Sequence, residues 1–415
     1  MWKLATSELL STFFPTWLWQ GREWAKGKIP KYDHYYWNNA CAHPVLSTFY
    51  PPSIISSYLG SKMGLDRAMV FFIGTLTVHI LGGFLAWYIL LSGAFEPLLS
   101  IFGAITLTFG AVSLRQQPCI IYTLVWFPWT LQQDPIVSAI AVGMMLLAGY
   151  YPFAIYLLPI AVAAHILWFQ EAWLLLGIII GLPQIIPFLK HLPNTIKRLD
   201  DKCEESPPWE RRFYVGVIPI MLLPWSTSRL WPLTVMSCLF ALGVGKHLFP
   251  RVHERWLIVV QFCVGWMAVS GLNNLGLSDK AYAILLFLHT FDIYWHNKEL
   301  LPPRPFCELW KRPSCAFNTP LTKFLEANLG DYKVSGLPWP LFTGHVNRLK
   351  TIGYCGSMQT KEMWDWRKSF KHDPFIDGVS EDDLTKHGIK YAYSRSKLDW
   401  PTTPIRHLYQ NPRII

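Results

Sequence analysis

Residues 68–92 read AMVFFIGTLTVHILGGFLAWYILLS, an apolar run without Asp, Glu, Lys or Arg. A helix needs about 20 consecutive apolar residues to cross a hydrocarbon core of about 30 Å, so this run predicts a membrane-spanning helix. Charge stays scarce further along the chain. The Asp, Glu, Lys and Arg side chains between residues 68 and 189 are Glu96, Arg115, Asp134 and Glu171. Each lies in a short gap between apolar runs, which indicates several successive spans.

The composition of the whole chain agrees with a membrane protein. Hydrophobic residues make up 52% of the 415 residues and charged residues 15%, against about 25% charged in a typical soluble protein. These values argue against a disordered chain, a coiled coil or an ordinary cytosolic enzyme. The net charge of +10 is typical of a basic surface beside anionic lipid, and we do not expect a nucleic-acid partner.

The apolar runs predict a mainly α fold, a polytopic helical membrane bundle of about ten spans. The expected spans cover residues 68–92, 97–114, 119–131, 136–149, 153–169, 172–189, 213–225, 231–246, 256–272 and 281–295. Residues 1–66 are expected to form a first loop with short interfacial helices, and residues 67–297 the transmembrane domain. Residues 298–415 carry evenly spread charge, which predicts a soluble α/β domain.

The charge distribution alone does not determine on which side of the membrane this tail lies. Cytoplasmic loops usually carry an excess of Lys and Arg. The loop at residues 191–212 is basic at both ends, which weakly favours a cytoplasmic tail. An even number of spans would place the first loop and the tail on the same side.

Two groups of ionisable residues stand out. Asp33 and His34 lie among aromatic residues of the first loop, where they could act as a general base or bind a metal. The simpler alternative is a turn that contacts lipid headgroups. In the last expected span, His289, Asp292 and His296 fall on one helical face. That trio either faces water near the helix end or, less simply, binds a metal.

The order of short motifs in the first loop resembles that of a known family. The motifs are Glu8 with Pro15, then Gly27 and Pro30, then Ala42-His43-Pro44, then Phe49-Tyr50-Pro51. Looser matches follow at residues 126–129, 146–152 and 181–187, and in the tail at 331–334, 353–354 and 388–392. Together they resemble the YfhO-like membrane proteins of the C-type glycosyltransferase superfamily, over most of the chain.

This resemblance implies an integral membrane enzyme of the inner (plasma) membrane with its tail extracytoplasmic. Such an enzyme transfers a sugar from a polyprenyl-phosphate donor to a cell-envelope acceptor. Glu8 would be the catalytic base, with Asp33 as second candidate. Substrate-binding candidates are His34, His43, Lys197, Arg198, Arg251 and Arg255. The expected partners are membrane lipid and the lipid-linked sugar. No cofactor is firmly implied and no metal ligand is assigned, although a divalent metal ion stays open.

The chain departs from the family pattern in three ways. Seven residues precede Glu8, where relatives have a first span, so a separate polypeptide could supply that span. Relatives also continue beyond the position of Ile415, and their acidic residue is usually Asp. The alternatives are therefore an inactive fragment of the transferase family, or a non-catalytic transport or export subunit or scaffold.

Overall fold

The computed structural model describes the ranges 13–33, 38–39, 47–110, 118–149, 151–167, 171–191, 214–242, 244, 256–298, 314, 317–335, 346–347, 349, 351–352, 385–386, 388–393, 403–404 and 408–410. Contacts divide the chain into two compact units. The first unit consists of Met1–Ala5, Gly74–Ile185 and Leu199–Pro302. The second consists of Thr6–Ile73, Ile186–Arg198 and Pro303–Ile415.

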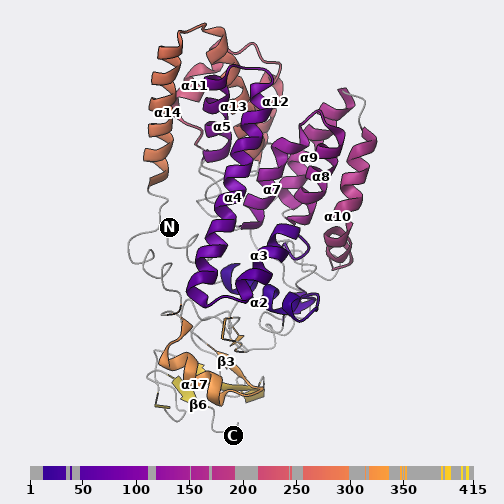
Figure 1. Cartoon of the computed structure of the whole chain (residues 1–415), viewed down its shortest axis with the longest axis vertical. Coiled ribbons are helices and arrows are strands. Elements are labelled where there is room, and N and C mark those ends of the chain that lie inside the picture. Colours follow the sequence, from indigo (N-terminus) through magenta and orange to yellow (C-terminus); the bar gives the residue numbers. More distant parts are fainter. Residues whose placement is uncertain are drawn as a thin grey trace. The chain divides into compact units, whose positions relative to one another are not determined.

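The described part of the chain is mainly helical (Figure 1). Its helices are α2 (Phe14–Ala25), α3 (Pro51–Ser61), α4 (Leu65–Ser92), α5 (Pro97–Phe109), α7 (Pro118–Thr130), α8 (Pro135–Leu147), α9 (Tyr151–Leu167), α10 (Glu171–His191), α11 (Val217–Leu222), η4 (Leu223–Trp225), α12 (Trp231–Ala241), α13 (Leu257–Asn274), α14 (Asp279–Lys298) and α17 (Pro320–Asn328). Its strands are β1 (Tyr32–Asp33), β2 (Asn38–Asn39), β3 (Lys333–Ser335), β4 (Thr351–Ile352), β5 (Ile389–Tyr393) and β6 (Leu408–Gln410).

Three of the described helices are long and apolar enough to cross a membrane. They are Leu65–Ser92, Trp173–Lys190 and Leu257–Asn274, in α4, α10 and α13. This fits a membrane protein, but it does not show the expected ten spans. Helices α5, α7 and α8 have 13 residues each, or about 20 Å at 1.5 Å per residue. That length is below the hydrocarbon thickness, so these helices do not qualify as spans by length.

Proline and a capping side chain set where the shorter helices begin. Proline suits the first helical turn because the N–H it lacks has no partner there. Helices α5 and α8 begin at Pro97 and Pro135. The Asp134 carboxylate accepts hydrogen bonds from the backbone N–H groups of Ile136 and Val137, at 2.9 and 3.1 Å. Helices α7 and α8 then pack together as a hairpin, and Ser138 Oγ donates to the Thr130 carbonyl at 2.9 Å.

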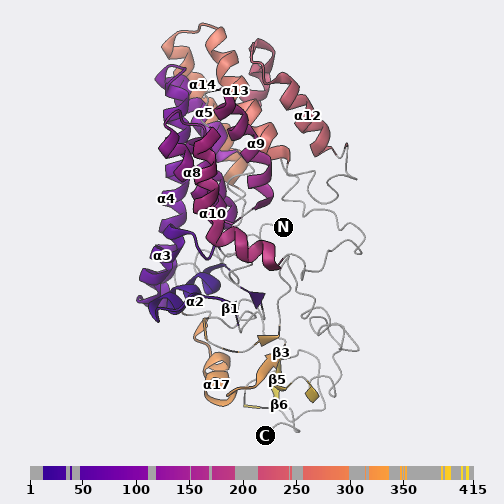
Figure 2. The same ribbon diagram turned by 90° about the vertical axis from the view of Figure 1, so that its right-hand side faces the viewer.

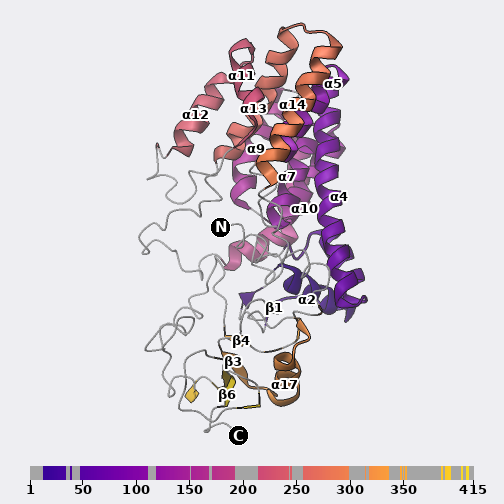
Figure 3. The same cartoon turned by 90° about the vertical axis from the view of Figure 1, so that its left-hand side faces the viewer.

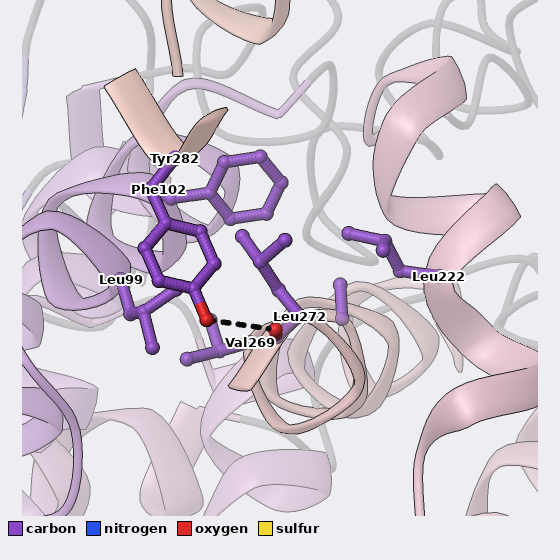
Figure 4. Close-up of a cluster of buried hydrophobic side chains, with 7 residues drawn as sticks. Leu99, Phe102, Leu222, Val269, Leu272 and Tyr282 are labelled. Carbon is purple, nitrogen blue, oxygen red and sulfur yellow. Dashed lines mark hydrogen bonds between the residues drawn. The ribbon is translucent and has the colours of Figure 1, made fainter. Parts of the chain in front are cut away.

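Helix α13 lies at the centre of the first unit and packs against α5, α9, α11 and α12. One cluster of buried side chains joins α5, α11 and α13 to α14 (Figure 4). Its members are Leu99, Phe102, Leu222, Ala268, Val269, Leu272 and Tyr282. The Tyr282 hydroxyl donates to the carbonyl of Leu272 at 3.4 Å and accepts from the backbone N–H of Leu277 at 3.0 Å. These bonds hold the short connection between α13 and α14.

The second unit holds a small sheet and α17 (Figure 2). The strand order is β4-β3-β5-β6, with β3 parallel to β4 and β5, and β5 antiparallel to β6. The side chain of Thr319 caps α17 by accepting from the backbone N–H of Thr322 at 3.2 Å. Phe324 of α17 contacts Tyr391 of β5, with ring centroids 5.6 Å apart. The tail therefore combines a helix with parallel and antiparallel strand pairs.

Candidate functional site

Most of the site residues predicted from sequence lie outside the described residues. These are Glu8, His34, His43, Lys197, Arg198, Arg251 and Arg255. Asp33 is described through its backbone. It ends strand β1 and pairs with Asn38 of β2 in an antiparallel hairpin. The described residues contain two candidate regions, the first loop around this hairpin and a polar cluster inside the helical unit.

The first loop folds around the contact between α2 and α3. The indole of Trp17 packs on the rings of Phe14 and Phe72, with centroids 6.1 and 5.1 Å away, and its Nε1 donates to Ser56 Oγ at 3.2 Å. Gly60 of α3 lies directly against the same indole. Aromatic burial of this kind contributes several kcal/mol of apolar transfer, at about 25 cal/mol per Å². The two helices therefore hold the ends of the segment that contains Asp33.

A glycine permits the close approach of these two helices. Gly21 of α2 faces the backbone carbonyl of Ser57 in α3, where a Cβ would overlap the carbonyl oxygen. Nearby, Gln20 Nε2 donates to Thr48 Oγ1 at 3.1 Å. Hydrogen bonds and close packing thus connect α2 to both the start and the body of the α3 segment.

The second region, here called the His289 cluster, lies in the first unit. It comprises Thr106 of α5, Tyr214 just before α11, Gln261 of α13, and His289, Asp292 and His296 of α14. Helices α5, α13 and α14 lie side by side in this unit (Figure 3). The cluster brings together residues that are up to 190 positions apart in the chain (296 minus 106).

His289 is fully buried, with 0% of its surface exposed. Its Nε2 lies 2.8 Å from Thr106 Oγ1, and the Thr106 hydroxyl donates to the Phe102 carbonyl at 2.9 Å. A hydroxyl has one proton to donate, so Nε2 of His289 must carry the hydrogen. The neutral ring then has its lone pair on Nδ1, an atom without a hydrogen-bond partner among the described residues.

The Nδ1 atom faces the backbone of Gly216. A Cβ at this position would lie 2.7 Å from Cε1 and 2.9 Å from Nδ1 of His289, and the φ of Gly216 is +99°. Only glycine adopts such a conformation without strain. Gly216 therefore lets the segment before α11 pass directly over the imidazole.

Asp292 joins the same segment to α14. Its Oδ1 accepts a hydrogen bond from the Tyr214 hydroxyl, and its Oδ2 accepts from the backbone N–H of Val217 at 2.9 Å. The His296 ring stacks on the Tyr214 ring, with centroids 3.6 Å apart and planes at 8°. Both carboxylate oxygens are thus occupied by protein donors.

Gln261 extends the polar region toward the end of α5. Its Nε2 donates to the carbonyls of Thr106 and Leu107, at 3.4 and 3.1 Å. The Thr106 carbonyl also accepts from the backbone N–H of Gly110 at 3.2 Å. Carbonyls in the last turn of a helix commonly lack intrahelical partners, and Gln261 supplies a donor to that of Leu107. Its Oε1 is buried without a partner among the described residues.

The sequence correctly placed His289, Asp292 and His296 on one face, but it did not identify their partners. Thr106, Tyr214 and Gln261 were missed, and the amide of Gln261 within an apolar run was the one visible signal. Within the described part of the chain, no three His, Cys, Asp or Glu side chains are arranged to hold a metal ion. The cluster offers one basic lone pair on Nδ1 and one amide oxygen.

A scan against protein-family models finds no match to this chain, and a search of curated proteins finds none either.

Proposed function

We propose that this chain is an integral membrane glycosyltransferase-like protein. In this proposal it transfers a sugar from a polyprenyl-phosphate donor to a cell-envelope acceptor. The observation that supports it best is the folded first loop, in which packed helices α2 and α3 flank the hairpin that contains Asp33. A carboxylate base must lie within about 3 Å of the hydroxyl it deprotonates, and the packing of α2 on α3 supports a fixed position for Asp33.

The proposed roles follow the resemblance in motif order. Glu8 is the proposed base and Asp33 the second candidate. Lys197, Arg198, Arg251 and Arg255 are proposed to bind the lipid phosphate through charge-assisted hydrogen bonds, with His34 and His43 as further donors to the substrate. A divalent metal ion remains a candidate cofactor.

The proposed location is the inner membrane, with the first loop and the tail extracytoplasmic and about ten crossings in all.

Membranes containing the chain and a polyprenyl-phosphate sugar provide the test. We expect Glu8→Gln or Asp33→Asn to reduce sugar transfer about 10²- to 10⁴-fold with unchanged expression. Glu23→Gln is the matched control, because Glu23 is a first-loop carboxylate that pairs with Lys26 and lies outside the motif. Full transfer by both Glu8→Gln and Asp33→Asn would show the site assignment to be wrong.

The second candidate is a non-catalytic transport or export subunit. The His289 cluster favours it, because ionisable residues inside helical membrane proteins commonly mark a pathway for ions or substrate. This candidate predicts the opposite pattern of variants. His289→Asn would abolish function in cells, whereas Glu8→Gln and Asp33→Asn would retain it.

A further inference from the structure

Two long-range hydrogen-bond contacts connect the first loop and the tail within the second unit. Asp66, at the start of α4, accepts from the backbone N–H of Ser314 at 2.9 Å and from its hydroxyl at 2.8 Å. Arg22 of α2 donates to the Val346 carbonyl at 3.0 Å. Groups in direct contact cannot lie on opposite sides of a bilayer about 30 Å thick. The chain therefore crosses the membrane an even number of times between Asp66 and Ser314.

Three of the described helices qualify as spans by length and hydropathy, which is an odd number. An even total therefore requires at least one further crossing.

We propose that α14 makes such a further crossing and that its outward face contacts lipid acyl chains. Its 20 residues span about 30 Å, which matches the hydrocarbon core. Asp279 and Lys280 lie at its start and Lys298 at its end, so both ends of the helix carry charged residues. Among the described helices that do not meet both criteria, α14 is the longest, since α9 has 17 residues and α11 and α12 have 6 and 11.

The outward face of α14 is apolar along its length. The exposed large residues recur at helical spacing and are Ile284, Phe287, Leu288, Phe291, Tyr294 and Trp295. Phe287, near the middle of the helix, is 69% exposed. Exposure of an apolar side chain costs free energy in water but not in hydrocarbon. Tyr294 and Trp295 lie near the end of the helix, where aromatic side chains favour the membrane interface.

The inward face explains why α14 lacks the high mean hydropathy of a typical span. His289, in the middle, is buried against Thr106. Asp292 bonds to Tyr214 and Val217, and His296 lies only two positions before Lys298. Polar groups are tolerated at membrane depth when they face protein partners. The His289 cluster therefore allows an ionisable helix to cross the bilayer.

Photolabelling of the wild-type chain tests the lipid contact. The protein is reconstituted in vesicles of phosphatidylcholine that carry a diazirine on the acyl chain, irradiated and mapped by mass spectrometry. We expect α14 to take label at Phe287 and Phe291 as strongly as α4 does at its exposed Val78 and Leu81, and several-fold more than buried α13. Absence of label from α14 while α4 is labelled would overturn the proposal and would mean that another surface covers this face.

The side of the membrane on which each loop lies provides an independent test. Single cysteines replace the exposed residues Lys62, Lys280 and Lys323 in a background without native cysteines, and an impermeant maleimide is added to one side. We expect Lys62→Cys and Lys323→Cys to react from the same side, and Lys280→Cys from the other. Reaction of all three from one side would overturn the crossing by α14. Neither test depends on sugar transfer, so failure of the proposed function would leave this inference standing.

Discussion

Thr106 Oγ1 of α5 lies 2.8 Å from Nε2 of His289 in α14, although 183 residues separate the two in sequence. Since the Thr106 hydroxyl donates to Phe102, it accepts the hydrogen of the imidazole. This single contact fixes the tautomer of the buried histidine and orients α14 on α5. Several measurable consequences arise from it and from its neighbours.

Thr106→Val should destabilise the protein by about 1 to 3 kcal/mol, because it leaves a buried imidazole N–H without an acceptor. The measurement is the free energy of unfolding in mixed micelles. Thr290→Val is the matched control, since the exposed Thr290 hydroxyl donates within its own helix to Leu286. That variant should change stability by less than about 0.5 kcal/mol. Equal effects of the two would contradict the structural role of Thr106.

Tyr214 and Asp292 should behave as a coupled pair. Asp292→Ala removes two hydrogen bonds to a charged group and should cost about 1.5 to 3 kcal/mol. Tyr214→Phe keeps the ring that stacks on His296 and removes only the hydroxyl. A double-mutant cycle should give a coupling energy of at least about 0.5 kcal/mol. Additive effects would mean that the hydroxyl and the carboxylate do not interact in solution.

Gly216→Ala should be more destabilising than Gly276→Ala. Both glycines have positive φ, +99° and +56°, but a Cβ at Gly276 meets nothing within 4 Å. Backbone strain alone costs about 1 to 2 kcal/mol, and the contact with His289 adds about 1 to 3 kcal/mol at Gly216. Thermal unfolding in detergent measures both. If the two variants lose the same stability, the segment does not pass over the imidazole.

Asp66→Ala should release the tail from the start of α4. The variant loses both hydrogen bonds to Ser314, so limited proteolysis near Ser314 should become several-fold faster. Ser314→Ala, which keeps the backbone donor, should have an intermediate effect. The control is Asp134→Ala, whose carboxylate also accepts two backbone N–H groups but lies in the other unit. Cleavage near Ser314 at the wild-type rate in Asp66→Ala would rule out this anchor.

The long apolar helices could be predicted because their signal is local. The runs at 68–92, 172–189 and 256–272 correspond to α4, α10 and α13. The run at 97–114 was expected to be a span, but α5 ends at Phe109. Apolar composition alone does not set helix length, so the number of crossings was less well determined than the class of protein.

Two features of this protein could be predicted from the amino-acid sequence: a largely helical, membrane-type chain, and one helix face shared by His289, Asp292 and His296. Both facts depend on composition and on the helical repeat, which neighbouring residues specify. The residues that this face contacts were not predictable and are known from the folded structure. Thr106, Gln261 and Tyr214 reach it from three other segments, and Ser314 reaches Asp66 across 248 residues. Such pairings result from packing of whole elements, which no local pattern encodes.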